Sequence, residues 1–306
     1  MSDLGMSAVA AGVPEALPAA EAPALRRTRA VFLHPGLLAG AAALAAIALA
    51  AAAAPLLAPH DPYAQDVSQR LIPPVWQAKG EWAHLLGTDK LGRDYLSRLI
   101  FGARTSLLIG ALSALTSGVI GTALGVTAGY FGGWADSVVS YIIMTRLAMP
   151  VVLVALAVAA LVGGSLQVVI LVIGLLLWDR FAVVSRSAAQ QVRAQEYIAA
   201  AKGAGIPTWR IIAQEVLPNI ANPLIVVATV EMAHAILLEA AFSFLGLGVQ
   251  PPQPSWGLMI AEGKQYMIFS PWLIAIPGAA LLVLVLAINL VGDGLRDLVT
   301  PRQRGQ

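Results

Sequence analysis

The chain has 306 residues, of which 58% are hydrophobic and only 12% are charged. That charged share is about half of what a soluble globular protein carries, and the mean hydropathy of +0.77 indicates that most of the chain lies in lipid. The composition excludes an ordinary soluble enzyme. The lack of cysteine excludes disulfides and thiolate metal sites, and a net charge of +2 gives no indication of nucleic-acid binding.

The sequence offers no recognisable metal site. Its four histidines are scattered along the chain and do not pair at the spacings typical of metal ligands; they are His34, His60, His84 and His234. We therefore expect no metal centre and no cofactor bound by this chain.

Six apolar stretches are long enough to cross a hydrocarbon core of about 30 Å, which takes roughly 20 helical residues. The expected spans are 36–58, 105–130, 138–162, 166–184, 220–244 and 271–292. Gly163-Gly164-Ser165 predicts the tight turn between the third and fourth. The alternation typical of a membrane β-barrel is absent, so the predicted fold is all-α, a polytopic membrane protein with six transmembrane helices.

The spans divide the chain into segments that we expect on alternate sides of the membrane. They are a cytoplasmic N-terminal tail (1–35), a first transmembrane helix (36–58), a periplasmic loop (59–104), a five-helix core (105–292) with a cytoplasmic loop (185–219), and a cytoplasmic C-terminal tail (293–306). Lys and Arg are more numerous in the cytoplasmic segments of this arrangement, as the positive-inside rule requires. The first apolar run is too long for a typical signal peptide, so a retained anchor is favoured.

The expected cytoplasmic loop contains a short helix that has little to bury by itself. Residues 196–205 are rich in alanine, which favours a helix. Gly205 is placed to end it, and Pro207 prevents its continuation. The small side chains fit two interpretations equally: a helix that enters a groove on another protein, or one that rests on the bilayer surface.

This loop resembles the EAA loop of ABC-importer permeases, in which two alanines precede a glycine and a Leu-Pro pair follows eleven residues later. The residues that carry the resemblance, together with the acid that opens the helix, are Glu196, Ala200, Ala201, Gly205, Leu217 and Pro218. The resemblance implies that 196–205 is a coupling helix, which docks on a cytoplasmic ATPase and transmits its closing motion into the membrane.

Three further stretches are similar to the dipeptide/oligopeptide/nickel branch of that family and to its C-type subunit. They are 87–107, 239–257 and 289–297. In order and at ordinary separations, they extend the resemblance over about residues 30–302 and imply the type I ABC importer permease fold. The sequence departs from the family pattern at Met144, where an acid is common, and at Val183, where an arginine is common.

The resemblance also implies partners. They are a second permease forming a heterodimer, one or two cytoplasmic ABC ATPases that use ATP and Mg²⁺, a periplasmic solute-binding protein that delivers peptides or a related solute (a nickel chelate or glutathione), and the lipid bilayer of a bacterial inner membrane with both termini cytoplasmic. No lysine of this chain is followed by Ser or Thr, so it lacks a phosphate-binding loop and is expected to be a transport subunit, not an enzyme. The alternative from a different class is an ion- or proton-coupled secondary transporter, although no internal repeat typical of that class is evident.

Two polar features within the spans invite a functional interpretation. Glu231 and His234 lie three residues apart in the fifth span and share a helix face; they line the translocation path or form a polar contact between helices. On the second span, small residues recur every fourth position: Ser113, Ser117, Gly121, Gly125 and Gly129. Such spacing allows close helix approach, and packing within this subunit is favoured over contact with another.

The last expected periplasmic segment is dense in proline, with Pro251, Pro252 and Pro254 ahead of Trp256. Prolines at this density fix an extended course, which suits a shelf that receives a binding protein or, alternatively, a rigid connector. The indole of Trp256 is expected at the membrane surface.

Overall fold

The computed structural model describes residues 35–162 and 164–299, and within them the chain is helical apart from turns and one isolated β-bridge. The helices are α2 (Pro35–Ala52), α3 (Ala54–Leu57), η1 (Val67–Gln69), α4 (Tyr95–Phe131), α5 (Gly133–Ala148), α6 (Val151–Val162), α7 (Leu166–Leu176), α8 (Trp178–Arg193), α9 (Glu196–Gly203), α10 (Thr208–Ile211), η2 (Ile212–Val216), α11 (Leu217–Phe244), α12 (Trp256–Gly263), η3 (Lys264–Tyr266) and α13 (Trp272–Val299). The all-α prediction is confirmed. Most of the expected N-terminal tail and residues 300–306 of the C-terminal tail lie outside the described residues.

Five stretches of the described chain are long and apolar enough to cross a membrane: Pro35–Ala52, Tyr95–Phe131, Leu166–Arg193, Thr208–Phe244 and Trp272–Leu298. They match five of the six expected spans. The remaining one, the third in chain order, was expected as a single helix over 138–162. It is divided into α5 and α6, because Pro150 lies between them and proline lacks the N–H that would continue the helix.

Two spans begin earlier than the sequence predicted. The helix expected from Thr105 starts at Tyr95, where Asp94 caps it by accepting a hydrogen bond from Ser97 N at 2.8 Å. The helix expected from Ile220 is preceded by α10 and the π-helical turn η2. Because Pro218 has no N–H to donate, the helix widens just before it.

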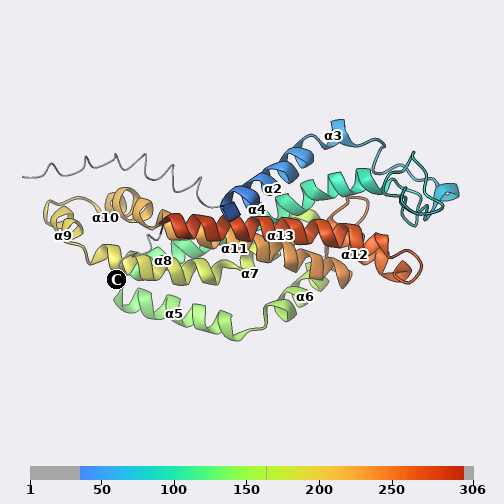
Figure 1. Cartoon of the computed structure of the whole chain (residues 1–306). Helices are drawn as coiled ribbons and strands as arrows, with labels where there is room; N and C mark the ends of the chain where they lie inside the picture. The colour runs from blue at the N-terminus through green and yellow to red at the C-terminus, as the bar shows by residue number, and fades with distance from the viewer. Residues whose placement is uncertain (1–34, 163, 300–306) are drawn as a thin grey trace, which may run out of the picture.

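The helices form an elongated bundle (Figure 1). The short helices α9 and α10 lie at one extremity, which we name the α9 end, and α12 lies with the loop of residues 58–94 at the other, the α12 end. Helices α5 and α6 follow one long edge of the bundle. An ion pair between Arg186 Nη2 and Asp136 Oδ2, at 2.8 Å, ties α5 to α8.

The small-residue stripe of α4 packs against α8 and α7 of the same chain. All five of its members are buried. A β-carbon on Gly121 would overlap the carbonyl oxygen of Trp178, and one on Gly129 would overlap that of Arg186. Ser113 Oγ donates to the carbonyl oxygen of Ile170 at 3.2 Å. The interpretation of the stripe as packing within the subunit is therefore confirmed.

Candidate functional site

A buried carboxylate lies near the middle of α11. The side chain of Glu231 is 1% exposed, and its Oε1 lies 3.3 Å from Arg180 Nε and 3.5 Å from His234 Nδ1. Arg180 comes from the first turn of α8, and both it and His234 are partly exposed. A buried carboxylate is costly unless polar groups face it, and here the guanidinium of Arg180 and the imidazole of His234 face Glu231.

Helix interruptions surround this carboxylate. The helical conformation is interrupted between α5 and α6 at Met149 and Pro150, and between α7 and α8 at Leu177. Arg146, in the last turn of α5, donates a hydrogen bond to the carbonyl oxygen of Leu176, which the second break leaves without a helical partner. Irregular backbone at membrane depth is tolerated where it lines a cavity.

These groups line a cavity of about 400 Å³. Its polar members are Arg146, Asp179, Arg180, Glu231 and His234. The cavity thus presents both signs of charge with apolar walls from Leu177, Leu237 and Leu238. Such an arrangement can hold a small molecule that carries an ammonium and a carboxylate, and the described residues contain no paired nucleophile and base here for covalent chemistry.

The structure brings together more than the sequence predicted. Glu231 and His234 share one face of α11, as expected, but the two arginines that complete the cluster were not predicted. Arg146 falls within the third expected span and Arg180 within the fourth, and neither was assigned to the translocation path. The available signal was their position: each is a basic residue within a few positions of a helix break, at Pro150 or Leu177.

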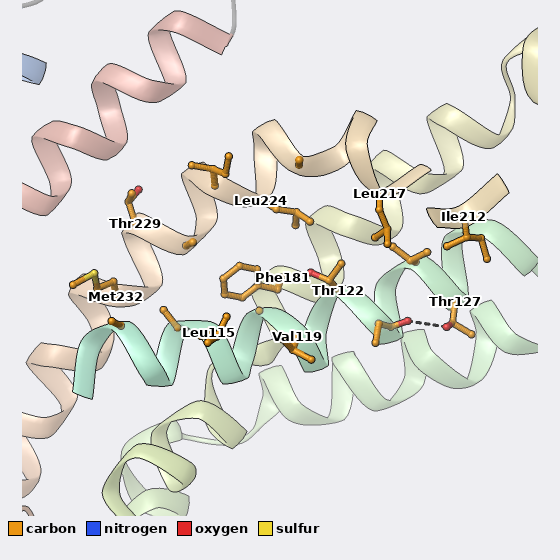
Figure 2. A pocket seen from close by; sticks show the side chains of 18 residues that line it. Leu115, Val119, Thr122, Thr127, Phe181, Ile212, Leu217, Leu224, Thr229 and Met232 are labelled. Atoms are coloured by element: carbon orange, nitrogen blue, oxygen red, sulfur yellow. Dashed lines mark hydrogen bonds between the residues drawn. The ribbon is translucent and has the colours of Figure 1, made fainter. Parts of the chain in front are cut away.

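A second hollow lies between α4 and α11 and differs in chemistry (Figure 2). It has a volume of about 910 Å³ and an almost wholly apolar lining, which includes Leu115, Phe181, Leu224 and Met232. Two of its three threonine hydroxyls, those of Thr127 and Thr229, donate to carbonyls of their own helices. The groove therefore suits an apolar helix face or a lipid chain and offers little to recognise a charged solute.

At the α9 end, the predicted coupling helix is largely exposed. Ile198 is its one fully buried side chain and anchors α9 in a cluster with Tyr130, Ile211 and Ile220. Glu196 and Ala200 are exposed, Ala201 is half-buried, and Lys202 Nζ lies 4.8 Å from the centre of the Tyr130 ring. One anchored face and one face of small, exposed side chains form a surface on which another protein can pack closely.

The end of α9 is fixed by Gly205. Its φ of +78° is in the left-handed region, where glycine is favoured. Gly205 N donates to Lys202 O at 3.0 Å and Ile206 N to Ala201 O at 3.1 Å, the pair of bonds that defines a Schellman ending. A β-carbon on Gly205 would meet nothing within 4 Å, so the surface beside it is open.

Leu217 and Pro218 lie apart from this surface, at the start of α11. Pro218 is exposed, and Leu217 is 39% exposed and lines the apolar groove. Their position after the widened turn η2 indicates that they set how α11 leaves the α9 end, and do not themselves extend the exposed face of α9.

At the α12 end, the proline-rich segment divides into two parts. Pro251 and Pro252 are exposed, whereas Pro254 and Trp256 are buried. The indole of Trp256, expected at the membrane surface, faces the protein interior, where its Nε1 donates to Leu99 O at 2.8 Å and its backbone N to Ser106 Oγ at 3.2 Å. Through these two hydrogen bonds, Trp256 holds the proline-rich segment against α4.

Glu239, a second buried carboxylate of α11, connects two helices. Its Oε1 accepts hydrogen bonds from Ser243 Oγ at 2.7 Å and from Ser255 Oγ at 2.8 Å. Because Ser255 is the N-cap of α12, this carboxylate joins α11 to the start of α12, and it lies apart from the Glu231 cluster.

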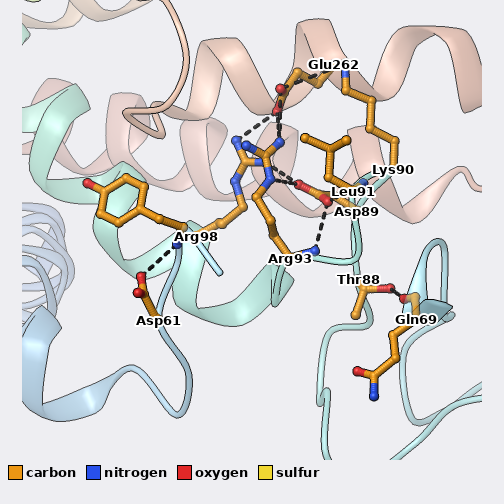
Figure 3. Close-up of polar contacts among 10 residues, drawn as sticks. Asp61, Gln69, Thr88, Asp89, Lys90, Leu91, Arg93, Arg98 and Glu262 are labelled. Carbon is orange, nitrogen blue, oxygen red and sulfur yellow. Dashed lines mark hydrogen bonds and ion pairs between the residues drawn. The ribbon is translucent and has the colours of Figure 1, made fainter. Parts of the chain in front are cut away.

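A network of buried charges joins the 58–94 loop to α12 (Figure 3). Arg98 Nη2 donates to Glu262 Oε2 at 2.8 Å, and Arg93 Nε donates to Asp89 Oδ2 at 2.6 Å. Arg98 also pairs with Asp89. Burial by itself would raise the pKa of Asp89, but Arg98 and Arg93, with two backbone N–H donors, hold it below its ordinary value.

Comparison with known proteins identifies the kind of chain that has this architecture. Residues 121–305 match the family described as "binding-protein-dependent transport system inner membrane component". Residues 26–74 match the "N-terminal TM domain of oligopeptide transport permease C".

Individual relatives that match this chain are also named as permease proteins of transport systems. A di/tripeptide transport system permease protein of Pseudomonas aeruginosa is 42% identical, with 89% of this chain and 90% of the relative covered. A glutathione transport system permease protein of Pectobacterium atrosepticum is 38% identical, with 72% and 73% covered. Among solved structures, an inward-facing MetNI methionine ABC transporter superposes with a TM-score of 0.54 at 18% identity, over 66% of this chain and 97% of the other, a likeness of fold.

Proposed function

This chain belongs to the family of binding-protein-dependent transport system inner membrane components, the transmembrane permease subunits of ABC importers, and from that premise we propose that it forms part of the path for a peptide. The solutes that we propose are di- and tripeptides, with glutathione and nickel chelates as related alternatives. The secondary-transporter alternative is set aside because of the family. As a transport subunit, the chain is not an enzyme.

The observation that carries the peptide proposal is the Glu231 cluster. A peptide at neutral pH has an ammonium at one end and a carboxylate at the other. Glu231 complements the first, and Arg180 and Arg146 complement the second, within one cavity. Relatives named for dipeptide and tripeptide transport support the same class of solute.

The proposal includes partners. A second permease completes the path, a periplasmic binding protein delivers the solute beside Pro251 and Pro252, and one or two ABC ATPases use ATP and Mg²⁺. The ATPases dock on the exposed face of α9, whose small residues surround Ala200 and Gly205. In the bacterial inner membrane, both termini and the α9 end face the cytoplasm, and ATP-driven closure of the ATPases switches the path between inward and outward access.

The test is uptake of a labelled dipeptide into proteoliposomes that hold the complete transporter, with binding protein at saturation. Glu231→Gln removes the charge and keeps the shape, so we expect uptake to fall by roughly 10-fold, equivalent to about 1.4 kcal/mol. Glu81→Gln, at an exposed loop residue, is the matched control and should leave uptake unchanged. Co-purification of the ATPase subunits reports that the variant folds and assembles. Unchanged uptake by assembled Glu231→Gln transporter would remove this cluster from the path.

A further inference from the structure

Two histidines that are far apart in the sequence meet at the α12 end. His60 follows α3, and His84 belongs to the loop before α4. Their ring centres lie 4.8 Å apart, and both Nδ1 atoms face one carboxylate oxygen: Asp94 Oδ1 is 2.9 Å from His84 Nδ1 and 3.6 Å from His60 Nδ1. Spacing along the chain gave no indication of this contact, because 23 residues separate the two histidines.

We propose that His60, His84 and Asp94 form a binding site for a zinc-like divalent metal ion. One ligand atom from each lies within 4.8 Å of the others. A tetrahedral zinc ion with bonds of about 2.0–2.2 Å holds its ligand atoms about 3.3–3.5 Å apart. The separation of 3.6 Å between His60 Nδ1 and Asp94 Oδ1 fits this spacing, and the 2.9 Å between His84 Nδ1 and Asp94 Oδ1 is a few tenths of an ångström shorter. The nitrogens of the two histidines lie within 4.8 Å of each other, so the ion fits once the ligands close around it.

Neighbouring side chains and backbone groups form hydrogen bonds with two of the three proposed ligands, His84 and Asp94. His84 Nε2 lies 2.8 Å from Gln69 Oε1, and the neutral tautomer that donates from Nε2 to this oxygen has a free lone pair on Nδ1, as a metal ion at Nδ1 requires. Asp94 Oδ2 accepts from Ser97 N at 2.8 Å and from Ser97 Oγ at 2.7 Å, which leaves Oδ1 to the histidines. Metal-binding residues typically have such outer hydrogen bonds, which fix their orientation.

The electrostatics also favour a cation. In the tautomer that donates from Nε2 to Gln69, the Nδ1 lone pair of His84 faces a carboxylate oxygen at 2.9 Å, and two acceptors at that distance repel each other unless a cation or a proton lies between them. A positive charge between them, either a metal ion or a proton on the ring, relieves the repulsion. His60 adds a second nitrogen on the same side, which a metal ion uses and a single proton on His84 does not need.

The ligand set defines the class of metal and leaves room for it. Two imidazoles and one carboxylate suit zinc and its neighbours among the divalent transition metals, whereas Mg²⁺ and Ca²⁺ prefer oxygen ligands. The His60 side chain is 42% exposed while Asp94 is 1% exposed, so the site has an open side. The ion would join the segment after α3, the loop and the N-cap of α4.

The experiment measures zinc bound to the purified full-length transporter carrying an affinity tag free of histidine, using zinc alone as the probe. We expect His60→Ala to lower the stoichiometry by one zinc per chain and to abolish the zinc-dependent rise in melting temperature. Its matched control is His234→Ala, a histidine variant at a different site, which should keep both. Gln69→Ala should weaken zinc binding by about 10–100-fold, the usual effect of losing a hydrogen bond that orients a metal-binding histidine.

Because His60 is partly exposed, its alanine variant is expected to fold, and its melting temperature without zinc verifies this. Equal zinc stoichiometry and affinity in wild type and His60→Ala would overturn the proposal. So would a wild-type chain that binds no zinc, in which case the ring of His84 joins Asp94 and Gln69 through hydrogen bonds alone.

Discussion

Asp89 is a residue whose pairing predicts a response to pH. Its pKa lies below the ordinary value of 3.8 in the folded protein, so its ionised form stabilises the fold at every pH above that value. The contribution is lost as the pH falls through the folded pKa. We therefore expect the stabilisation due to Asp89 to be constant from pH 7 to about pH 5, to begin to fall near about pH 4, and to be lost once the pH passes below the folded pKa.

The measurement is the melting temperature of wild type and Asp89→Asn in nanodiscs between pH 7 and pH 3. At pH 7 the variant should be destabilised by about 3–5 kcal/mol, because Arg98 and Arg93 stay buried without their partner. The difference should shrink toward pH 3. The exposed Asp61→Asn should change stability by less than about 0.5 kcal/mol. A difference for Asp89→Asn that is equally large at both pH values would contradict the assignment.

At the scale of single residues, local chemistry was predictable and long-range pairing was not. The role of Gly205 at the end of α9 follows from a glycine before Ile206 and Pro207, and its positive φ confirms it. The meeting of His60 with His84 depends on the course of an irregular loop, which no periodicity encodes. For the same reason Arg98 and Glu262, which are 164 residues apart in the sequence, were not predicted to pair.

At the scale of elements, the close contact of α4 with α8 predicts how glycine-to-alanine changes in α4 alter stability. A β-carbon on Gly125 would overlap Ala182 O and Ser185 Oγ, so Gly125→Ala should force the helices apart and cost about 1–3 kcal/mol. About two turns earlier on the same helix, a β-carbon on Gly118 would lie 3.4 Å from the Phe181 ring, which is ordinary contact. Gly118→Ala should then be neutral or stabilising by about 0.5–1 kcal/mol, since alanine favours the helix.

Thermal unfolding of the two alanine variants in the same detergent checks this directly. Equal melting temperatures for Gly118→Ala and Gly125→Ala would mean that α4 and α8 are not packed as closely as described.

Helix existence was predictable from hydropathy, and helix ends were less so. Five spans followed from runs of uncharged residues, but Pro150 divides the third in a way that hydropathy does not register, because proline is apolar and acts through its missing N–H. The start of α4 at Tyr95 was missed because Arg98 and Arg104 look like loop residues. Arg98 is tolerated in the helix because Asp89 and Glu262 neutralise it.

For the whole molecule, the proposed orientation predicts which surfaces a reagent reaches. The chain has no cysteine, so a single introduced cysteine is a unique label, and Gln65, Gln191 and Gln253 are all exposed. In intact cells with a permeable outer membrane, an impermeant maleimide should label Gln65→Cys and Gln253→Cys, and should label Gln191→Cys only after the inner membrane is opened. Labelling of Gln191→Cys from outside would reverse the orientation.

The central claim is that α9 connects this permease to its ATPases, and Gly205 gives the most direct test. Gly205 and Gly246 have nearly the same φ, +78° and +82°, and a β-carbon would meet nothing within 4 Å at either, but they lie on different surfaces. Arginine at both positions therefore imposes similar backbone strain, while only Gly205→Arg obstructs the proposed ATPase-docking face.

The decisive measurement is co-purification of the ATPase subunits with the permease, together with dipeptide uptake in proteoliposomes. Gly205→Arg should lose the ATPases and reduce uptake by at least about 10-fold, equivalent to about 1.4 kcal/mol, while Gly246→Arg retains the ATPases. Gly205→Arg transporter that keeps both its ATPases and its uptake would contradict the account and leave α9 as a helix on the bilayer surface.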